Sequence, residues 1–185
     1  HASNHQSDAK TLRLGGITFD PLREPSVLPH HLAKASASKS DLRLVQFHGP
    51  VRDADRAQLR SRGVELVQYI HPDTYITWAD PDQMRSVASM STVRWGGDFA
   101  PAFRVLPHLR GRGEAELQVR ILIYRGADVE AAVRALHDLG ITTVKRRRMD
   151  STSEVVGCSV RGSLLEQIAA IPGVYTLQPM ARNGG

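Results

Sequence analysis

The chain has 185 residues, of which 41% are hydrophobic and 23% are charged, as in ordinary globular proteins. No apolar run reaches the roughly 18 residues of a membrane-spanning helix, and the single cysteine, Cys158, excludes an intrachain disulfide. The net charge of +5 raises nucleic acid as a partner, but residues 41–108 are neutral and much of the excess is one run, Lys145–Arg148. The sequence therefore does not predict a broad basic face.

Residues 1–40 have no regular pattern over most of their length. Residues 1–10 are polar, which is typical of disorder. Residues 11–25 contain a short strand-like piece, and residues 34–40, "KASASKS", have the composition of a linker. We therefore expect residues 1–40 to form an extended, partly disordered segment.

Residues 41–106 predict a first folded unit. β-rich runs predict strands at Leu42–His48, Val64–Ile70 and Thr74–Ala79, and a fourth strand begins at Val93. The strands alternate with two helices, which gives the order β-α-β-β-α-β.

The two helices of this unit are indicated by their end signals. Asp53 or Asp55 can cap the first helix, and Gly63 can end it in the left-handed conformation. Asp80, followed by proline, predicts the start of the second helix, which ends near Met90.

Residues 117–178 repeat the same order after a linker at residues 107–116. Asp128 predicts the start of the first helix, and Ser163 that of the second. The four predicted strands are Leu117–Tyr124, Ile141–Arg148, Ser153–Val160 and Val174–Gln178.

The duplicated order predicts an α+β fold made of two tandem ferredoxin-like βαββαβ open-faced sandwiches. A right-handed crossover in each half of a unit places both helices on one face of a four-stranded antiparallel sheet. The other face of each sheet lacks helices, so it must meet solvent, another domain or a partner.

No motif for catalysis or for cofactor binding occurs in the sequence. His30 and His31 are adjacent and point apart, and no cysteine or carboxylate lies at ligand spacing, so we expect no metal site. Cys158 lies in the apolar run "EVVGCSV" and is interpreted as a buried small hydrophobic residue. Nucleophile elbows, phosphate loops and dinucleotide fingerprints are missing. We therefore expect no catalytic residues, no cofactor and no enzymatic activity.

Two other classes of binding module share the predicted fold. RNA-recognition modules stack bases on aromatic residues of the two central strands. Phe47 with Tyr75 or Trp78 could serve in the first unit, but the second unit offers only Tyr124. Lys145–Arg148 is interpreted as a hairpin tip that projects past the helices into water. Small-molecule-sensing regulatory domains also share the fold, although their effector-binding glycine motif is not evident. Both classes remain alternatives, as a tandem nucleic-acid-binding or small-molecule-sensing module.

Several stretches of the first unit form a set that resembles a known family. They are Leu44–Phe47 followed by Gly49-Pro50, Tyr69-Ile70 with Pro72, Val93–Gly96, and Pro101–Phe103. This set resembles the prosegments of large secreted bacterial subtilisin-like serine proteases. Leu12–Leu22 resembles the segment before that unit, and residues 117–178 resemble a further propeptide-like module. Gly97 departs from the family pattern and predicts a loose end to the fourth strand.

The resemblance implies a propeptide (a subtilisin-propeptide-like inhibitor and intramolecular chaperone of a zymogen) for the catalytic domain of the same precursor. It implies a secreted precursor whose signal peptide is not part of this sequence, with no membrane or nucleic acid as partner. The helix-free sheet face is expected to dock on the protease. "VYTLQPMARN" resembles the junction with the catalytic domain, and the tail expected in the substrate cleft is Pro179, Met180, Ala181, Arg182, Asn183, Gly184 and Gly185.

The resemblance also bears on the aromatic stretch after the fourth strand. We expect Phe99, Pro101 and Phe103 to pack between the two units or against the protease. Trp95 is either part of the core or an interface anchor. Asp98 and Arg104 are expected at the rim.

Overall fold

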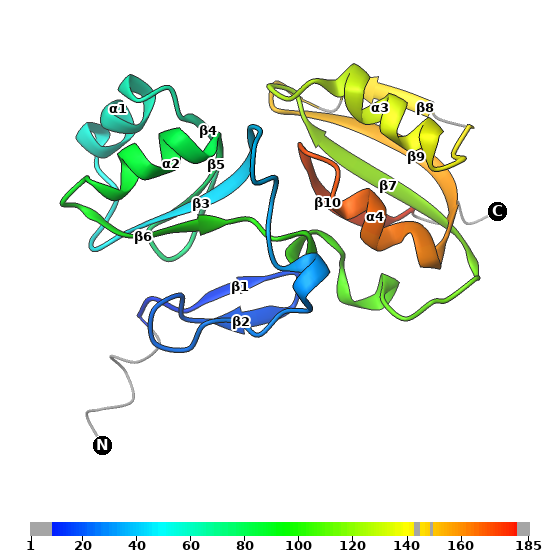
Figure 1. Cartoon of the computed structure of the whole chain (residues 1–185), viewed down its shortest axis with the longest axis horizontal. Helices are drawn as coiled ribbons and strands as arrows, with labels where there is room; N and C mark the ends of the chain where they lie inside the picture. Colours follow the sequence, from blue (N-terminus) through cyan, green and yellow to red (C-terminus); the bar gives the residue numbers. More distant parts are fainter. Residues whose placement is uncertain (1–8, 143–144, 149, 181–185) are drawn as a thin grey trace.

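The structure is a computed structural model and describes residues 9–142, 145–148 and 150–180 (Figure 1). Two four-stranded antiparallel sheets, each with two α-helices, and an N-terminal two-stranded hairpin make up this part of the chain. The predicted α+β class with antiparallel sheets is confirmed. Residues 1–8, which belong to the segment predicted to be disordered, lie outside the described residues.

The first sheet has the strand order β4-β5-β3-β6, and every neighbouring pair is antiparallel. The elements of this unit are β3 (Asp41–Phe47), α1 (Asp53–Ser61), β4 (Glu65–Ile70), β5 (Thr74–Ala79), α2 (Pro81–Ala88) and β6 (Val93–Asp98).

The predicted helix ends are present with one difference. The Asp80 side chain accepts a hydrogen bond from Gln83 N (2.8 Å), and the Gln83 side chain accepts one from Asp80 N (2.8 Å), which forms a capping box before α2. At α1 neither predicted aspartate is the N-cap residue. Asp55 instead lies in the first turn and accepts a hydrogen bond from Arg52 N (2.9 Å). Gly63 follows α1 with φ +80°, as predicted.

The second sheet has the order β10-β7-β9-β8, again antiparallel throughout. The elements are β7 (Glu116–Tyr124), α3 (Val129–Asp138), β8 (Lys145–Arg148), β9 (Ser153–Arg161), the 3-10 turn η4 (Gly162–Leu164), α4 (Leu165–Ala169) and β10 (Val174–Pro179). When strands are numbered within each unit, both sheets have the same order, with the first and third strands in the centre.

Three predictions for this unit need correction. Ser163 is not a helix cap, because it lies inside η4 and α4 begins only at Leu165. Lys145–Arg148 is exposed but is not a hairpin tip, because it forms the edge strand β8 and pairs with β9, as the C-terminal part of the predicted second strand. The predicted strand began at Ile141, but Ile141 N donates to Leu136 O (3.1 Å), so this residue lies in the turn that follows α3.

Both helices of each unit cover the same face of their sheet. In the first unit, Val45 and Phe47 of β3 pack against Leu59 of α1 and Val87 of α2. In the second unit the helix-facing core takes alternate residues of β7 and the apolar residues of both helices: Val119, Ile121, Ile123, Ala132, Val133, Leu136, Leu165, Ile168 and Ala169. Because successive side chains of a strand point to opposite faces of the sheet, the other residues of β7 lie on the opposite face, which carries no helix.

The N-terminal segment folds back as a hairpin, which the sequence interpretation missed. β1 (Leu12–Leu14) pairs with β2 (Ile17–Phe19) through a two-residue turn. Gly15 and Gly16 have φ of +55° and +78°, the signs that a type I′ turn requires. The 3-10 turn η1 (His30–Leu32) follows, and the linker-like residues 34–40 are held in place where Arg43 Nη2 donates to Ser36 O (2.5 Å).

The hairpin covers the helix-free face of the first sheet, on the side opposite α1 and α2 in Figure 1. The hydrophobic cluster between them combines Leu12, Leu14 and Phe19 of the hairpin with Leu42, Leu44 and Ile76 of the sheet, and Phe99 and Phe103 of the following segment. This face is therefore occupied by the chain's own N-terminal segment.

Candidate functional site

A buried arginine joins the two units. Arg104 is the last residue of the 3-10 turn η2 (Pro101–Arg104), which lies on the path from β6 to a second turn, η3 (Pro107–Leu109), and to β7. Its side chain is 0% exposed. It donates to Phe99 O (2.6 Å) and to Ala169 O of the second unit (3.1 Å). The prediction that Arg104 lies at a rim is wrong.

The anionic partner of Arg104 is Asp41, the first residue of β3. Arg104 Nη2 donates to Asp41 Oδ1 at 3.2 Å, and the same carboxylate oxygen accepts hydrogen bonds from Leu42 N (2.8 Å) and Gly173 N (3.3 Å). Burial lowers the pKa of Arg104 from its ordinary value, and the charge of Asp41 opposes that shift. These contacts hold the first sheet against the turn before β10 of the second unit.

A second contact between the units covers half of the helix-free face of the second sheet. Tyr124, at the end of β7, packs on Trp78 with ring centroids 5.7 Å apart and donates from its hydroxyl to Glu65 Oε1 (2.8 Å). Burial, together with the hydrogen bond to Glu65, raises the pKa of Tyr124. On the same face Leu122 and Val155 are also buried.

The other half of that face is accessible. Gln118 is exposed, and Arg120, Gly157 and Ser159 are partly exposed. These four residues share the helix-free face, because the β7–β9 register pairs Arg120 with Gly157 and Gln118 with Ser159. The sequence interpretation did not single out Arg120 or Gly157. A glycine inside a β-rich run was the available signal, since glycine in a strand often marks close approach of another group.

The predicted tail begins beside this accessible half. Pro179 is still paired with Val119, and Met180 N donates to Gln118 O (2.9 Å). Ala181–Gly185, the rest of the predicted tail, lie outside the described residues. The other edge of β10 is partly covered, because Leu106 N donates to Leu177 O (3.4 Å).

The predicted interface aromatics are gathered at the centre of the molecule. The Phe103 ring stacks on Phe19 of the hairpin (5.1 Å between centroids), and Phe99 lies 6.1 Å from Phe103. Pro101 is buried. Partly buried Trp95 packs against the same cluster, which also includes Tyr124 of the second unit.

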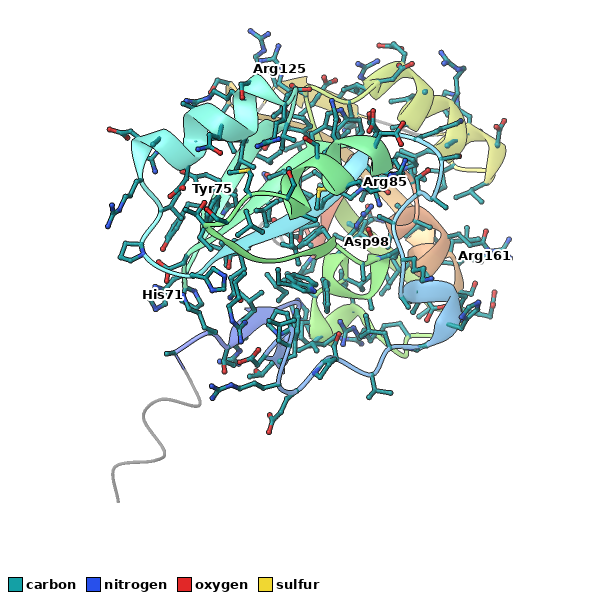
Figure 2. All side chains as sticks on the ribbon, turned by 60° about the vertical axis from the view of Figure 1, so that its left-hand side comes forward. His71, Tyr75, Arg85, Asp98, Arg125 and Arg161 are labelled. Atoms are coloured by element: carbon teal, nitrogen blue, oxygen red, sulfur yellow. The ribbon has the colours of Figure 1, made fainter. Side chains whose placement is uncertain are left out.

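Two details of β6 correct the sequence interpretation. Gly97 pairs with Leu44 inside β6, so the strand end is not loose, and a Cβ at Gly97 would lie 2.1 Å from the Trp95 ring. Asp98, labelled in Figure 2, is not a free rim residue, because it accepts hydrogen bonds from Arg43 Nη1 (2.7 Å) and Ala35 N (3.2 Å).

The structure places the single cysteine and the possible metal ligands. Cys158 faces the core, and burial raises its pKa to about 11, which disfavours the thiolate. No group of three or more His, Cys, Asp or Glu side chains within residues 9–142, 145–148 and 150–180 is placed to hold a metal ion. In the same residues, no helix is long and apolar enough to cross a membrane.

One pocket, with a volume of about 540 Å³, lies between the N-terminal segment, the crossover after η2 and the start of α4. Its wall is apolar, with Ile17, Leu28 and Leu109 among the lining residues. Its charged side chains already have partners: Arg110 donates to Ala102 O (2.7 Å), and Glu166 Oε2 lies 2.9 Å from His31 Nε2. Polar groups that converge on a small ligand are therefore not evident in this pocket.

Comparison with known proteins gives one partial match. A family model for a domain of unknown function (DUF8729) matches residues 13–100, just under half of the chain. The matched range starts in β1 and ends after β6, so it spans the hairpin together with the first sheet that it covers. No curated protein and no solved structure matches the chain.

Proposed function

We propose that the chain is the propeptide of a secreted subtilisin-like serine protease. In this proposal it serves as intramolecular chaperone and as temporary, product-like inhibitor of the catalytic domain in the same precursor. Each unit is a ferredoxin-like βαββαβ sandwich. The identical strand orders β4-β5-β3-β6 and β10-β7-β9-β8, with both helices of each unit on one face, support that assignment.

The observation that carries the proposal is the position of the C-terminal segment. β10 ends at Pro179 beside the accessible half of the helix-free face, and Met180 still follows β7 through its hydrogen bond to Gln118 O. That half docks on the catalytic domain, and the chain beyond Met180 continues into the substrate cleft as an added strand. Main-chain hydrogen bonds then supply affinity without a well-placed scissile bond.

The proposal assigns docking to the second unit rather than to both. The helix-free face of the first sheet is filled by the hairpin and by Phe99 and Phe103, so the protein itself already occupies it. The first unit and hairpin then form a scaffold that holds the second unit through Arg104 and Asp41. Because the propeptide binds the folded catalytic domain and not the unfolded one, binding stabilises the folded state by mass action, which is the chaperone role.

The structure disfavours the nucleic-acid alternative. Phe47 and Tyr75, two of the candidates for base stacking, belong to the helix-facing core of the first unit. Tyr75 is labelled in Figure 2 on the side of α1. Tyr124 is buried against Trp78. Among the described residues, neither sheet therefore presents two exposed aromatics on its central strands, which RNA-recognition modules use.

The test has a genetic and an enzymatic part. The gene beyond the codon for Gly185 is expected to encode a domain with Asp, His and Ser motifs in that chain order. The purified full chain is expected to inhibit that domain competitively. A chain that ends at Met180 keeps every described sheet contact, so it is expected to unfold at the same temperature but to inhibit at least about tenfold less well, since it loses several main-chain hydrogen bonds.

Two results would overturn the proposal. One is a gene without a subtilisin-like domain after this segment. The other is equal inhibition by the full chain and the chain ending at Met180, which would mean that the tail does not occupy the cleft. The alternative of a small-molecule sensor would be favoured only by a ligand that raises the melting temperature of the full chain.

A further inference from the structure

The accessible half of the second sheet contains a row of residues with a cation at each side of a glycine. Across the sheet, the register places Gln178 of β10 beside Arg120 of β7, then Gly157 of β9, then Lys145 of β8. Adjacent strands lie about 4.8 Å apart, so the Cα atoms of Arg120 and Lys145 are roughly 10 Å apart. The long side chains of both residues can therefore reach one group above Gly157.

A third cation stands beside this row. Arg147 lies two residues after Lys145 on β8 and therefore on the same face, opposite Val155. The result is a groove of about 460 Å³. Its lining combines cationic side chains with a small apolar part: Arg120, Lys145, Arg146, Arg147, Val155, Gly157 and Met180.

The cations on this face have no anionic partner within the residues that the structure describes. Arg146, which alternation places on the helix-bearing side together with Arg148, pairs with Glu130 and Glu154 at 2.8 Å each. For Arg120, Lys145 and Arg147 no such contact exists in that part of the chain. Three like charges around one groove repel one another, and an anion placed between them relieves that repulsion.

Residue 157 has no side chain, so the space above it on this face is bordered by Met180 and is not filled from β9 itself. The three atoms nearest to a Cβ at Gly157 would be two side-chain atoms of Met180, at 3.8 Å, and the carbonyl oxygen of Lys145, at 3.9 Å, and all three distances are ordinary contacts. Gly157 is also outside the left-handed region, so its backbone conformation does not call for glycine. Glycine weakens a strand interior, and its presence there often marks a site that another group approaches closely.

We propose that this groove, formed by Arg120, Gly157, Lys145 and Arg147, binds acidic side chains of a partner polypeptide. The identity of that partner as the catalytic domain rests on the proposed function. An Asp or Glu carboxylate of the docked surface lies above Gly157 between Arg120 and Lys145, and the apolar part of the same surface contacts Met180. Met180 is 40% exposed and leads directly into the tail, so the groove and the cleft-binding segment are neighbours on one binding surface.

Two features favour a polypeptide over a nucleic acid. The outer edge of β8 is not paired with another strand in the described sheet, so it offers backbone donors and acceptors to an extended segment. The groove lining contains no aromatic side chain for base stacking. Charged side chains on an edge strand can also serve to prevent pairing with other chains, which would explain the cations on β8. That role does not explain Arg120, because Arg120 lies on the central strand β7.

The experiment compares two sets of variants of the full chain. Arg120→Gln/Lys145→Gln removes the two cations beside Gly157, and Gly157→Val fills the space between them while favouring strand structure. The matched control, Arg60→Gln/Arg134→Gln, removes the same charge at exposed helix positions on the other side of the sheets. Each protein is measured for inhibition of the subtilisin-like catalytic domain and for binding of a labelled ten-residue peptide of alternating Glu and Thr, at 50 and 300 mM salt.

The double variant and Gly157→Val are expected to lose about tenfold to a hundredfold in affinity for both probes at 50 mM salt, with a weaker dependence on salt. The control is expected to stay within about twofold of the wild type. Thermal unfolding of Gly157→Val is expected at or above the wild-type temperature, so a loss of binding would not reflect misfolding.

Failure of this inference is distinct from failure of the proposed function. If the wild type inhibits and the groove variants inhibit equally well with the same salt dependence, the groove does not bind the partner, although the proposed function stands. If the wild type does not inhibit, the proposed function is wrong, and binding of the acidic peptide becomes the test of the groove. Peptide binding that is unchanged in Gly157→Val would then overturn the inference that the groove binds acidic side chains. Tighter binding of a twenty-nucleotide oligothymidylate than of the peptide would also overturn it, in favour of nucleic acid.

Discussion

Arg104 and Asp41 form an ion pair of 3.2 Å whose two side chains are 0% and 1% exposed. A buried pair is not by itself evidence of net stabilisation, because removing two charges from water is costly. Here the remaining hydrogen-bonding groups are also satisfied: Arg104 reaches backbone carbonyls of both units, and Asp41 accepts three backbone N–H groups, from Ser36, Leu42 and Gly173. The pair therefore fixes how the second unit sits against the first.

Removal of one partner should be costly. Arg104→Met leaves the Asp41 carboxylate buried without its cation, and we expect the free energy of unfolding to fall by roughly 3–5 kcal/mol. Urea unfolding followed by circular dichroism measures this. Arg85→Met is the control, because Arg85 pairs with Asp82 at an exposed position and should change stability by less than about 0.5 kcal/mol. Equal effects of the two variants would show that the pair does not hold the units together.

The N-terminal hairpin should behave as part of the folded core. Leu12 is 0% exposed against the first sheet, whereas Leu22 is 54% exposed. We expect Leu12→Ala to lower the free energy of unfolding by about 2–5 kcal/mol and Leu22→Ala by less than about 0.5 kcal/mol. Proteolysis by trypsin gives an independent measurement, with faster cleavage after Arg13 in Leu12→Ala. A Leu12→Ala protein as stable as the wild type would mean that the hairpin is not docked in solution.

Acid should destabilise the protein partly through Asp20. Burial by itself raises the pKa of this carboxylate, but hydrogen bonds from Leu22 N, Arg23 N and Arg94 outweigh it and lower the pKa below its ordinary value. A carboxylate with a lowered pKa in the folded state stabilises the protein at pH values above about 4. That contribution is lost as the pH falls through the lowered value.

The corresponding variant is Asp20→Asn. It is expected to be less stable than the wild type at pH 7 and to show a flatter decline of the free energy of unfolding below about pH 4. Urea titrations at pH 2.5, 3, 4, 5 and 7 measure both effects. Parallel curves for the two proteins over this range would contradict the assigned role of Asp20.

Local signals in the sequence were sufficient for most helices and strands. The Asp80-Pro81 start of α2 and the glycine that follows α1, Gly63, depend on hydrogen bonds and dihedral angles within a few residues. The hairpin was also predictable, because Gly15-Gly16 between apolar residues is a type I′ turn signal. Its docking on the first sheet was not, since the matching apolar face arises only after that sheet has formed.

Long-range burial and strand register explain what the sequence could not show. Arg104 follows an aromatic stretch and looks like a surface residue, because its partner Asp41 lies 63 positions earlier. The basic run Lys145–Arg148 was interpreted as one feature, whereas strand alternation divides it between two faces. Arg120 and Gly157 become neighbours of Lys145 only through the order β7-β9-β8.

Cys158 should report opening of the second unit. It packs between β9 and the helices, and burial raises its pKa to about 11. The unfolded thiol ionises at about pH 8.5, so between roughly pH 9 and 11 the unfolded state binds fewer protons than the folded state, and this residue lowers stability as pH rises.

At pH 8 we expect iodoacetamide to modify the native chain at least about a hundredfold more slowly than the urea-unfolded chain, because reaction requires opening of the core. Modification of the native protein at the rate of a free thiol would contradict the burial of Cys158. If the Arg104–Asp41 pair also stabilises the second unit, Arg104→Met should accelerate this labelling.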